Sequence, residues 1–439
     1  MMKELICDNL SVNESDHLCL GGQDTVLLAE RYGTPLYLFD EDRIRLQCRT
    51  YRKAMTKGFG EKALPLYASK AASFKQIYRI MQEEGMGIDV VSVGEICTAH
   101  AVGFPLERAY FHSNNKTDAD ILYAIERGVG YFVVDNREEL DAIERIAGEQ
   151  GKVQKILLRL TPGIDPHTYE AVSTGNVDSK FGSAIETGQA EEITAYALTL
   201  PHLHLSGFHC HVGSQVFDAD VFLRSAAIML NFVAEMQKRY GYVTEELDLG
   251  GGFGVRYLAE DPVMEIEKNI LAIGEAVSAQ CKELGIDLPA MRMEPGRSIV
   301  AEAGMTLYTV GTVKRIPGYK NYVSVDGGMT DNPRFALYRS PYTMLLANRT
   351  EKADAEEAMR CSVVGRCCES GDILQENVRM PRTVARGDLL AVLTTGAYNY
   401  SMSSNYNRIP RPPVVMLRDG ESYLAVKRET PEDVCRNDL

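Results

Sequence analysis

Leu64-Pro65-Leu66-Tyr67-Ala68-Ser69-Lys70 is a short apolar stretch that ends in a single lysine. Its aliphatic and aromatic residues predict a buried β-strand, and the segment after it, over residues 74–84, has helical period. The strand would deliver the amine of Lys70 at its carboxyl end. A lysine in that place is ordinarily a solvated charge, so a chemical role for Lys70 depends on other groups that converge on it.

The same strand–helix pattern repeats outward from this stretch. Further strand-like runs occupy residues 88–92, 109–112, 131–134, 155–160, 205–211, 247–249 and 291–294. Helical segments are expected from about Gly94, Asp118, Arg137 and Glu186, and from Phe222 to Arg239. Eight such units in about 260 residues predict an α/β fold of the (β/α)8 barrel type. A doubly wound open sheet is the alternative.

The pattern changes beyond about residue 300. Short strand-like runs such as 305–310 and 388–393 are separated by glycine and proline and show little helical period, which predicts a β-rich domain. The apolar pieces Leu18-Cys19-Leu20 and Val26-Leu27-Leu28 are too short to form a domain and could complete its sheet. We therefore expect a barrel over residues 36–300 and a second, β-rich domain from residues 1–35 and 301–439.

Composition narrows the class of protein. The chain has 439 residues and a net charge of -14, and no basic cluster interrupts that balance, which argues against a nucleic-acid partner. The first residues are too polar for a signal peptide, and no apolar run reaches membrane-spanning length. The ten cysteines form no Cys-x-x-Cys pair and suit reduced thiols. A cytoplasmic protein without a membrane partner is expected.

A barrel places its chemistry at the carboxyl ends of its strands. Lys70 follows the first strand, and the later strand ends carry His211-Val212-Gly213-Ser214, Gly250-Gly251-Gly252 and Glu294-Pro295-Gly296-Arg297. A glycine run lets backbone amides approach an anion closely, and the loops after strands seven and eight are the usual phosphate site of this fold. The alternative is that the glycines only form a tight turn.

A lysine, a phosphate site, a carboxylate and an arginine at one barrel end suggest pyridoxal 5'-phosphate. The amine of Lys70 can form an imine with the aldehyde, and the phosphate anchors the cofactor. A carboxylate such as Glu294 would keep the pyridine nitrogen protonated, so that the ring withdraws electrons. His211 could stack on the ring; alternatively it is a hydrogen-bonded strand histidine.

A metal-dependent barrel hydrolase is the competing interpretation. His202-Leu203-His204 and His209-Cys210-His211 each place two imidazoles on the same side of a strand, which is a metal-binding geometry. However, His202 and His204 lie at or before the amino end of their strand, and no carboxylate ligand can be assigned from the sequence. No metal is therefore expected.

Motifs along nearly the whole chain resemble those of the diaminopimelate decarboxylase family. These are pyridoxal-phosphate enzymes of the alanine-racemase-like fold type, which also includes ornithine and arginine decarboxylases. The resemblance rests on the order of the motifs Tyr67-Ala68-Ser69-Lys70, Asp178-Ser179-Lys180-Phe181-Gly182, His211-Val212-Gly213-Ser214-Gln215, Gly250-Gly251-Gly252, Glu294-Pro295-Gly296-Arg297, Asp326-Gly327-Gly328-Met329, Cys368-Glu369-Ser370-Gly371-Asp372 and Gly396-Ala397-Tyr398.

The resemblance implies a role for each residue. Lys70 would bind the cofactor covalently, His211 would stack on its ring, and Glu294 would contact the pyridine nitrogen. Cys368 would donate the proton that replaces carbon dioxide, and Cys368 and Glu369 would come from the partner subunit of a head-to-tail homodimer that shares its active sites. The remaining implied cofactor contacts are Asp89, Ser214, Gly251, Gly252, Pro295, Gly296, Arg297 and Tyr398.

The resemblance also implies a substrate, meso-2,6-diaminopimelate, and a product, L-lysine, in the last step of lysine biosynthesis. Diaminopimelate carries an ammonium and a carboxylate at its far end. Arg297, Arg334 and Tyr338 resemble the family's carboxylate clamp, Glu369 resembles its ammonium partner, and Tyr398 would touch cofactor and substrate. The alternatives are a decarboxylase of ornithine, arginine or lysine, and an inactive binding homologue, against which the presence of Lys70 and Cys368 argues.

Two positions depart from the family pattern. Val93 stands where relatives often carry glycine, and Tyr169 where they often carry histidine. Both are expected near the mouth of the barrel, where they could alter loop closure or rate. A structural role without function is the alternative for two residues. Arg334 could form a surface salt bridge, and Cys368 could be an unreactive small residue beside Cys367.

Overall fold

The computed structural model of the chain describes residues 5–164 and 180–439. The chain divides into two compact units. We call residues 47–254 and 264–296 the barrel unit, and residues 1–46, 255–263 and 297–439 the β-rich unit. The domain boundaries expected from the sequence, between residues 35 and 36 and between residues 300 and 301, remain a prediction.

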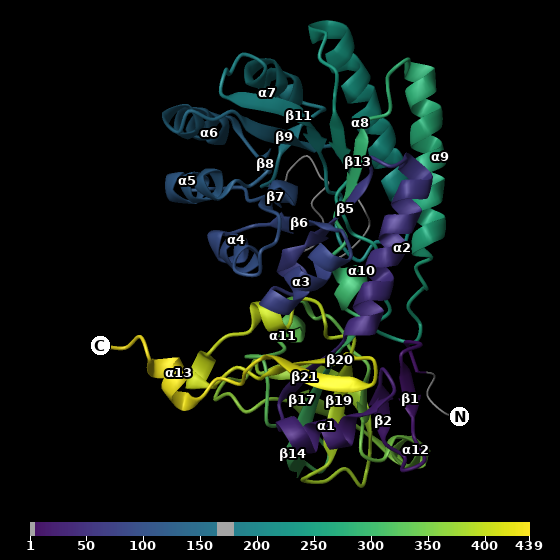
Figure 1. The fold of residues 1–439 in the computed structure, drawn as a ribbon. Helices are drawn as coiled ribbons and strands as arrows, with labels where there is room; N and C mark the ends of the chain where they lie inside the picture. The colour runs from purple at the N-terminus through teal and green to yellow at the C-terminus, as the bar shows by residue number, and fades with distance from the viewer. Residues whose placement is uncertain (1–4, 165–179) are drawn as a thin grey trace. The chain divides into compact units, whose positions relative to one another are not determined.

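The barrel unit contains a closed ring of eight parallel strands within the described residues (Figure 1). Pairing between β8 and β9 joins the two ends of the sheet, so the open-sheet alternative is wrong and the predicted barrel is confirmed. In chain order the strands are β5 (Leu64–Ala68), β6 (Gly87–Val90), β7 (Ala109–Phe111), β8 (Tyr131–Val134), β9 (Gln154–Thr161), β11 (Leu203–His209), β12 (Glu246–Asp248) and β13 (Ala290–Met293), and the short β10 (Ser183–Ala184) pairs with β9.

These strands are buried along most of their length, as expected for a parallel sheet that is covered by helices outside and filled by side chains inside. Leu66, Tyr110, Val133 and Leu157 come from four strands and form one buried cluster. The barrel is therefore a packed core.

Helices alternate with the strands (Figure 1), and all but α2 and α9 lie where the periodicity predicts a helix. They are α2 (Glu41–Phe59, in this unit from Gln47), α3 (Lys75–Glu83), α4 (Val93–His100), α5 (Asp118–Arg127), α6 (Arg137–Glu149), α7 (Gln189–Ala197), α8 (Ala219–Tyr240) and α9 (Ile266–Leu284), with 3-10 turns η1 (Ser69–Ala71) and η2 (Leu106–Arg108). Local chemistry sets their ends. Thr117 and Asp120 form a capping box at the start of α5, and Gly128 ends it in the left-handed conformation.

The β-rich unit is built on a second large sheet with the strand order β18-β17-β15-β14-β4-β20-β21, to which β16 and β19 attach. Its strands are β4 (Leu36–Asp40), β14 (Gly304–Arg315), β15 (Asn321–Val325), β16 (Met344–Leu346), β17 (Ala358–Val364), β18 (Ile373–Pro381), β19 (Leu389–Leu393), β20 (Val414–Arg418) and β21 (Glu421–Val426). Short helical segments connect them: α10 (Arg297–Val300), α11 (Arg334–Tyr338), α12 (Thr350–Ala355), α13 (Pro431–Cys435), η4 (Tyr400–Met402) and η5 (Tyr406–Arg408).

The N-terminal segment completes this β-rich unit, as predicted, since Leu18, Leu20 and Leu28 lie in its hydrophobic core. The large sheet itself is joined by β4, whose residues were expected in the barrel. β4 inserts between β14 and β20, antiparallel to β14 and parallel to β20. The earlier pieces β1 (Leu10–Val12), β2 (Leu18–Leu20) and β3 (Gln23–Asp24) form a small sheet of their own. Val26 to Leu28 belong to helix α1 (Thr25–Tyr32), because Asp24 caps the amides of Val26 and Leu27 and starts a helix there.

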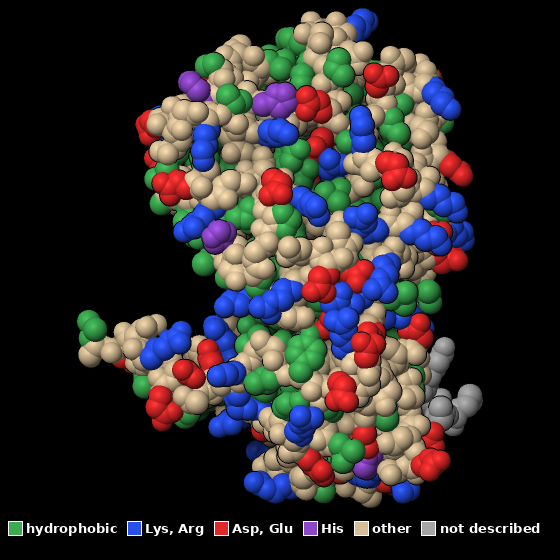
Figure 2. Space-filling view, in the orientation of Figure 1, with side chains coloured by type: hydrophobic (Ala, Val, Ile, Leu, Met, Phe, Trp, Pro, Cys, Tyr) green, Lys and Arg blue, Asp and Glu red, His purple; other side chains and the backbone are tan. Residues whose placement is uncertain are grey.

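Acidic and basic side chains lie intermingled on the face of the molecule in Figure 2. In the part of the chain that the structure describes, no helix has the length and apolar character needed to cross a membrane.

Candidate active site

The carboxyl ends of the barrel strands carry the residues predicted from the sequence. Lys70 lies in η1 directly after β5, Asp89 lies near the end of β6, and Glu294 follows β13. His211 comes two residues after the end of β11. The positive charge of Lys70 acts on both Asp89 and His211, so these strand ends converge on the lysine.

Glu294 is the centre of a buried group of side chains. Its exposed fraction is 8%, and its Oε1 lies 2.7 Å from His112 Nε2 while its Oε2 lies 3.1 Å from His209 Nε2. Burial opposes a charge on Glu294, but the two imidazoles outweigh it and hold the pKa of the carboxyl well below its usual range. Glu294 is therefore ionised although it is buried.

The pKa values of the neighbouring Asp89 and His211 are instead shifted toward the neutral form of each group. Burial raises the pKa of Asp89, and the charge of Glu294 adds to that effect against the attraction of His112. Burial and the charges of Lys70 and Arg159 hold the pKa of His211 well below its usual range, so His211 is a neutral imidazole. Its Nδ1 accepts a hydrogen bond of 3.3 Å from the amide of Gly251, which sets the orientation of the ring.

The glycine run after β12 forms a backbone surface that has no room for side chains. A Cβ added to Gly251 would lie 2.1 Å from the carbonyl oxygen of Glu294, and one added to Gly252 would lie 2.3 Å from that of Gly213. Gly252 also has φ +124°, which other residues rarely adopt. The predicted glycines are therefore needed for close approach and not only for a turn.

Pyridoxal 5'-phosphate fits the residues at this end of the barrel. Buried polar atoms there lack a hydrogen-bond partner within the described residues, among them Ser69 Oγ, Asp89 Oδ1 and His209 Nδ1. His112 Nε2 and Glu294 Oε1 also lack hydrogen-bond geometry, although they lie 2.7 Å apart. An amine at Lys70, an ionised carboxylate at Glu294 and a tight glycine surface match the aldehyde, the pyridine nitrogen and the phosphate of that cofactor. Ser214, Pro295 and Gly296 lie in the same unit, in the loops after β11 and β13.

Sequence reasoning missed four residues of this group: His112, His209, Arg159 and Asp248. Asp248 is the last residue of β12, and burial together with the charge of Glu294 raises its pKa well above the usual range. Arg159 is in β9 and faces Asp135 and Glu294. The signal was available for His112, which ends the predicted strand over residues 109–112. Asp248 lies inside the predicted run 247–249, and only the structure shows that the strand ends at Asp248.

The histidines of the metal alternative do not act together. His202 pairs with Glu144 at 2.6 Å, and His204 pairs with Glu245 at 3.0 Å, and both histidine side chains are partly exposed. His209 instead pairs with Glu294, with Nε2 at 3.1 Å from Oε2. The one group of three side chains in the described residues whose ligand atoms lie within 4.8 Å of one another is His112, His209 and Glu294.

The β-rich unit holds a separate group of two buried arginines around Tyr398. Arg297 has an exposed fraction of 5% and donates from Nη1 to the Tyr257 hydroxyl at 2.6 Å. The guanidinium groups of Arg297 and Arg334 lie 4.8 Å and 5.2 Å from the centre of the Tyr398 ring. Arg334 also lies 5.5 Å from the ring of Tyr338.

Arg334 is not part of a surface salt bridge. It is 6% exposed, it forms no ion pair with a carboxylate of the described residues, and its Nε has no hydrogen-bond partner among them. Tyr398 has φ +64°, a left-handed conformation that costs a residue with a side chain about 1 kcal/mol or more. A buried cation with spare donors beside a strained tyrosine is the arrangement expected of an anion-binding site.

Cys368 and Glu369 are exposed residues of the β-rich unit. The amide of Cys368 donates to Asn407 Oδ1 at 2.9 Å, and the two oxygens of Asp372 accept from the amides of Met329 and Cys367. Burial raises the pKa of the neighbouring Cys367 to about 12, with the carboxylate of Asp372 adding to the effect. Of the two thiols, the exposed one is Cys368.

The two positions that depart from the family pattern are Val93 and Tyr169. Val93 is the first residue of α4, whose start Ser92 caps. Tyr169 and the pair Asp178-Ser179 lie outside the described residues.

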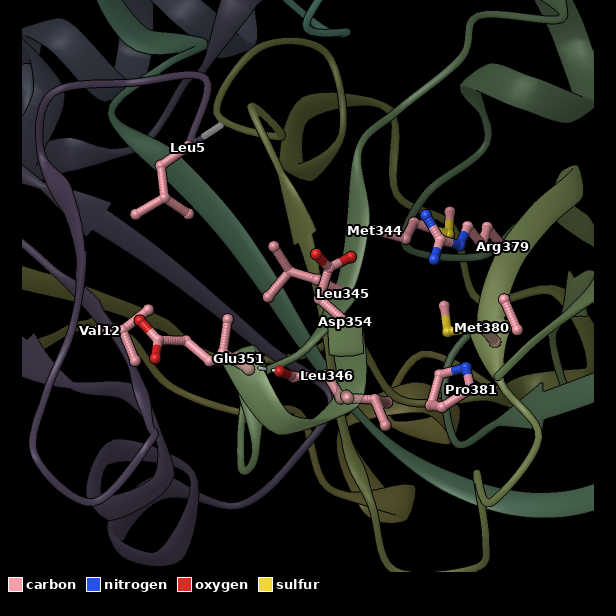
Figure 3. A pocket seen from close by; sticks show the side chains of 13 residues that line it. Leu5, Val12, Met344, Leu345, Leu346, Glu351, Asp354, Arg379, Met380 and Pro381 are labelled. Carbon is pink, nitrogen blue, oxygen red and sulfur yellow. Dashed lines mark hydrogen bonds between the residues drawn. The ribbon is translucent and has the colours of Figure 1, made fainter. Parts of the chain in front are cut away.

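A well-formed pocket of the β-rich unit, between β16, α12 and β18, contains none of the predicted site residues. Figure 3 shows it with the charged side chains of Arg379, Glu351 and Asp354.

Comparison with known proteins connects both groups of residues to one family. Residues 41–301 match the family model described as pyridoxal-dependent decarboxylase, pyridoxal binding domain. The diaminopimelate decarboxylase of Bacillus subtilis is 45% identical to this chain over 97% of it and 96% of the relative. That of Staphylococcus aureus is 43% identical over 97% of this chain and 98% of the relative.

Solved structures agree. Diaminopimelate decarboxylase from M. jannaschii in complex with L-lysine has a TM-score of 0.91 and 31% identity, and the match covers 99% of each chain. A lysine/ornithine decarboxylase from Vibrio vulnificus in complex with cadaverine is less similar, with a TM-score of 0.76, 25% identity, and coverage of 90% of this chain and 98% of the other.

Proposed function

The chain belongs to the diaminopimelate decarboxylase family of pyridoxal-dependent decarboxylases, and from this premise we propose that it converts meso-2,6-diaminopimelate to L-lysine and carbon dioxide. The observation that carries the proposal is the likeness to diaminopimelate decarboxylases along nearly the whole chain. The buried arginines of the β-rich unit support it, because they supply the cationic groups that a substrate with a second carboxylate requires.

Pyridoxal 5'-phosphate is the cofactor of this family, and when bound it withdraws electrons from the carbon that loses carbon dioxide. Lys70 is proposed to hold its aldehyde carbon through the side-chain amine. Glu294, whose pKa is held well below its usual range, would accept a hydrogen bond from the ring nitrogen of the cofactor and favour its protonated form. The ring of His211, oriented by the amide of Gly251, would support the flat face of the cofactor.

Substrate binding and proton supply fall to residues of the β-rich unit. Arg334 and Arg297 are proposed to bind a substrate carboxylate, with Tyr338 and Tyr398 beside them and Glu369 at the distal ammonium. The reaction breaks the bond between the α-carbon and one carboxylate, which leaves as carbon dioxide. A proton from the Sγ of Cys368 takes its place on the α-carbon, so that atoms and charge balance.

An assay with meso-diaminopimelate, ornithine, arginine and lysine offered in parallel tests the substrate. We expect carbon dioxide release from meso-diaminopimelate and its loss in a Lys70→Ala variant. Release from one of the other three amino acids alone would replace the proposal with a decarboxylase of that amino acid. Absence of any turnover, together with no borohydride-reducible adduct on Lys70, would favour the inactive homologue.

We further propose a cytoplasmic homodimer in which each active site uses Cys368 and Glu369 of the partner subunit. The exposure of both side chains supports this assembly, and ten free cysteines suit a reducing compartment. Mixing inactive Lys70→Ala and Cys368→Ala subunits tests it. Random pairing would restore about a quarter of the wild-type activity, because half of the dimers would contain one intact site. No recovery from subunits that exchange would contradict shared sites.

A further inference from the structure

Both oxygens of Glu294 are occupied by imidazole groups from strands other than its own. His112 directly follows β7 and approaches Oε1 at 2.7 Å, while His209 ends β11 and approaches Oε2 at 3.1 Å. The two rings pack edge to face, with centroids 4.9 Å apart and planes at 73°. The carboxylate is therefore held from two sides by rings that also brace each other.

The proton positions follow from the surroundings. His209 is 1% exposed, and its Nδ1 has no hydrogen-bond partner among the described residues, so the proton of a neutral ring belongs on Nε2, where Glu294 accepts it. Burial lowers the pKa of His209, against the attraction of Glu294, which agrees with a neutral ring. His209 thus donates to Glu294 and leaves the negative charge on the carboxylate.

The other ionisable groups around Glu294 favour the same distribution of charge. Burial raises the pKa of both Asp89 and Asp248, and the charge of Glu294 contributes to each shift. Environments that push neighbouring carboxyl groups apart in pKa assign them different tasks. The groups that face Glu294 across the strand ends are His112, His209, His211, Arg159, Cys210, Asp89 and Asp248.

We propose that His112 and His209 are positioning residues that fix the carboxylate of Glu294 as the acceptor for the cofactor's ring nitrogen. A buried carboxylate that lost the hydrogen bond from His209 and the close contact with His112 would gain rotational freedom and would take up a proton more readily. A neutral carboxylic acid at Glu294 would not stabilise a positive charge on the pyridine ring of the cofactor. The inference rests on the role proposed for Glu294, and it does not depend on which amino acid is the substrate.

Cofactor binding to apoprotein provides the test. The probes are pyridoxal 5'-phosphate and the analogue in which a C–H replaces the ring nitrogen, since both carry the same aldehyde and phosphate. The ratio of their dissociation constants measures the contact at the nitrogen alone. We expect wild type to prefer pyridoxal 5'-phosphate and His209→Leu to lose about tenfold of that preference, the usual size of a hydrogen bond to a charged group.

A conservative variant separates positioning from packing. The amide nitrogen of glutamine can occupy the place of the imidazole Nε2, so His209→Gln should keep most of the preference that His209→Leu loses. The same pair of substitutions at His112 gives an independent reading if the His209 variants fail to fold, as judged by circular dichroism.

His202 is the matched control. It also pairs with a glutamate, at 2.6 Å from Glu144, but it precedes β11 at the opposite end of that strand and its side chain is 43% exposed. His202→Leu should leave the ratio unchanged. If His209→Leu and His112→Leu weaken binding of both probes equally, the histidines act only in packing and the inference is overturned. A failure of the substrate assay would not move this ratio, so the two proposals fail separately.

Discussion

The barrel unit has two buried polar groups of similar composition that differ in how far they are hydrogen-bonded. One surrounds Glu246, at the start of β12. Its carboxylate accepts from Tyr110 at 2.7 Å and Tyr131 at 2.9 Å and pairs with Arg292 at 2.9 Å. Arg292 also donates to Tyr110 and to the carbonyl of Lys62, so the side chains of this Glu246 group satisfy one another.

The other group surrounds Glu294, one strand away and toward the carboxyl ends. Asp89 Oδ1 and His209 Nδ1 have no hydrogen-bond partner within the described residues, although both side chains are buried. Unsatisfied buried polar atoms are costly, so a fold keeps them where a ligand will use them. The comparison indicates that the fully hydrogen-bonded Glu246 group at one end of the barrel serves stability. The Glu294 group at the other end, with polar atoms that lack partners, serves binding.

The largest expected effect is on activity. Glu294→Gln removes the charge that would hold the ring nitrogen protonated, and we expect the turnover number for meso-diaminopimelate to fall about 100-fold or more. Steady-state kinetics measure this. The midpoint of unfolding should fall by less than turnover does, since the one amide oxygen of glutamine can still accept from His209. A variant with full activity would remove Glu294 from the cofactor site.

The matched change in the other group should act on stability instead. Glu246→Gln leaves the buried Arg292 without its counter-charge, and we expect the free energy of unfolding to fall by about 3 kcal/mol or more. Urea denaturation followed by circular dichroism gives the value. Turnover by the folded fraction should equal that of wild type. If turnover fell as far as in Glu294→Gln, the division between the two groups would be wrong.

Removal of the cofactor should affect the two groups unequally. A ligand at one hundred times its dissociation constant stabilises the folded protein by about 2.7 kcal/mol. We expect the apoprotein to lose protection from hydrogen exchange after β5, β6 and β11, at the Glu294 end, more than at Tyr131 and Glu246. Mass spectrometry of apo and cofactor-loaded protein compares them. Equal loss at both ends would indicate that the barrel responds as one body.

The smallest expected effect is that of a single hydroxyl. Tyr131→Phe removes one of the donors to Glu246 while the stacked pair of Tyr110 and Tyr131, with ring centroids 4.4 Å apart, keeps its packing. The free energy of unfolding should fall by about 1 kcal/mol, because Arg292 and Tyr110 still satisfy the carboxylate. Differential scanning calorimetry resolves such a shift. No measurable change would show that this hydrogen bond is redundant.

Much of the fold could be predicted because barrel strands are short apolar runs that alternate with helical segments of regular period. The strand that ends before Lys70 and those after it were found within a few residues of their observed bounds. The strand partners of β4 could not be predicted from the local pattern. Residues 36–40 continue the strand-like rhythm, yet they pair with β14 and β20, since pairing depends on long-range partners that local pattern does not encode.

The candidate site divides in the same way. Position after a strand and the family motifs identify Lys70, His211, Glu294 and the glycine run from the sequence, because a parallel barrel brings all carboxyl ends to one face. The sequence by itself also determines which residues can supply an amine, a thiol or a guanidinium. Those chemical identities do not depend on the fold.

Only the tertiary structure decided which of these groups are charged and what holds them. Glu294 and Asp248 are both carboxyl groups at strand ends, and nothing local distinguishes them. His112 and His209, more than eighty residues from Glu294 in sequence, lie against the carboxylate of Glu294 and lower its pKa, while burial and the charge of Glu294 raise the pKa of Asp248. The reason is physical: a pKa depends on distances and burial that exist only after the barrel has closed.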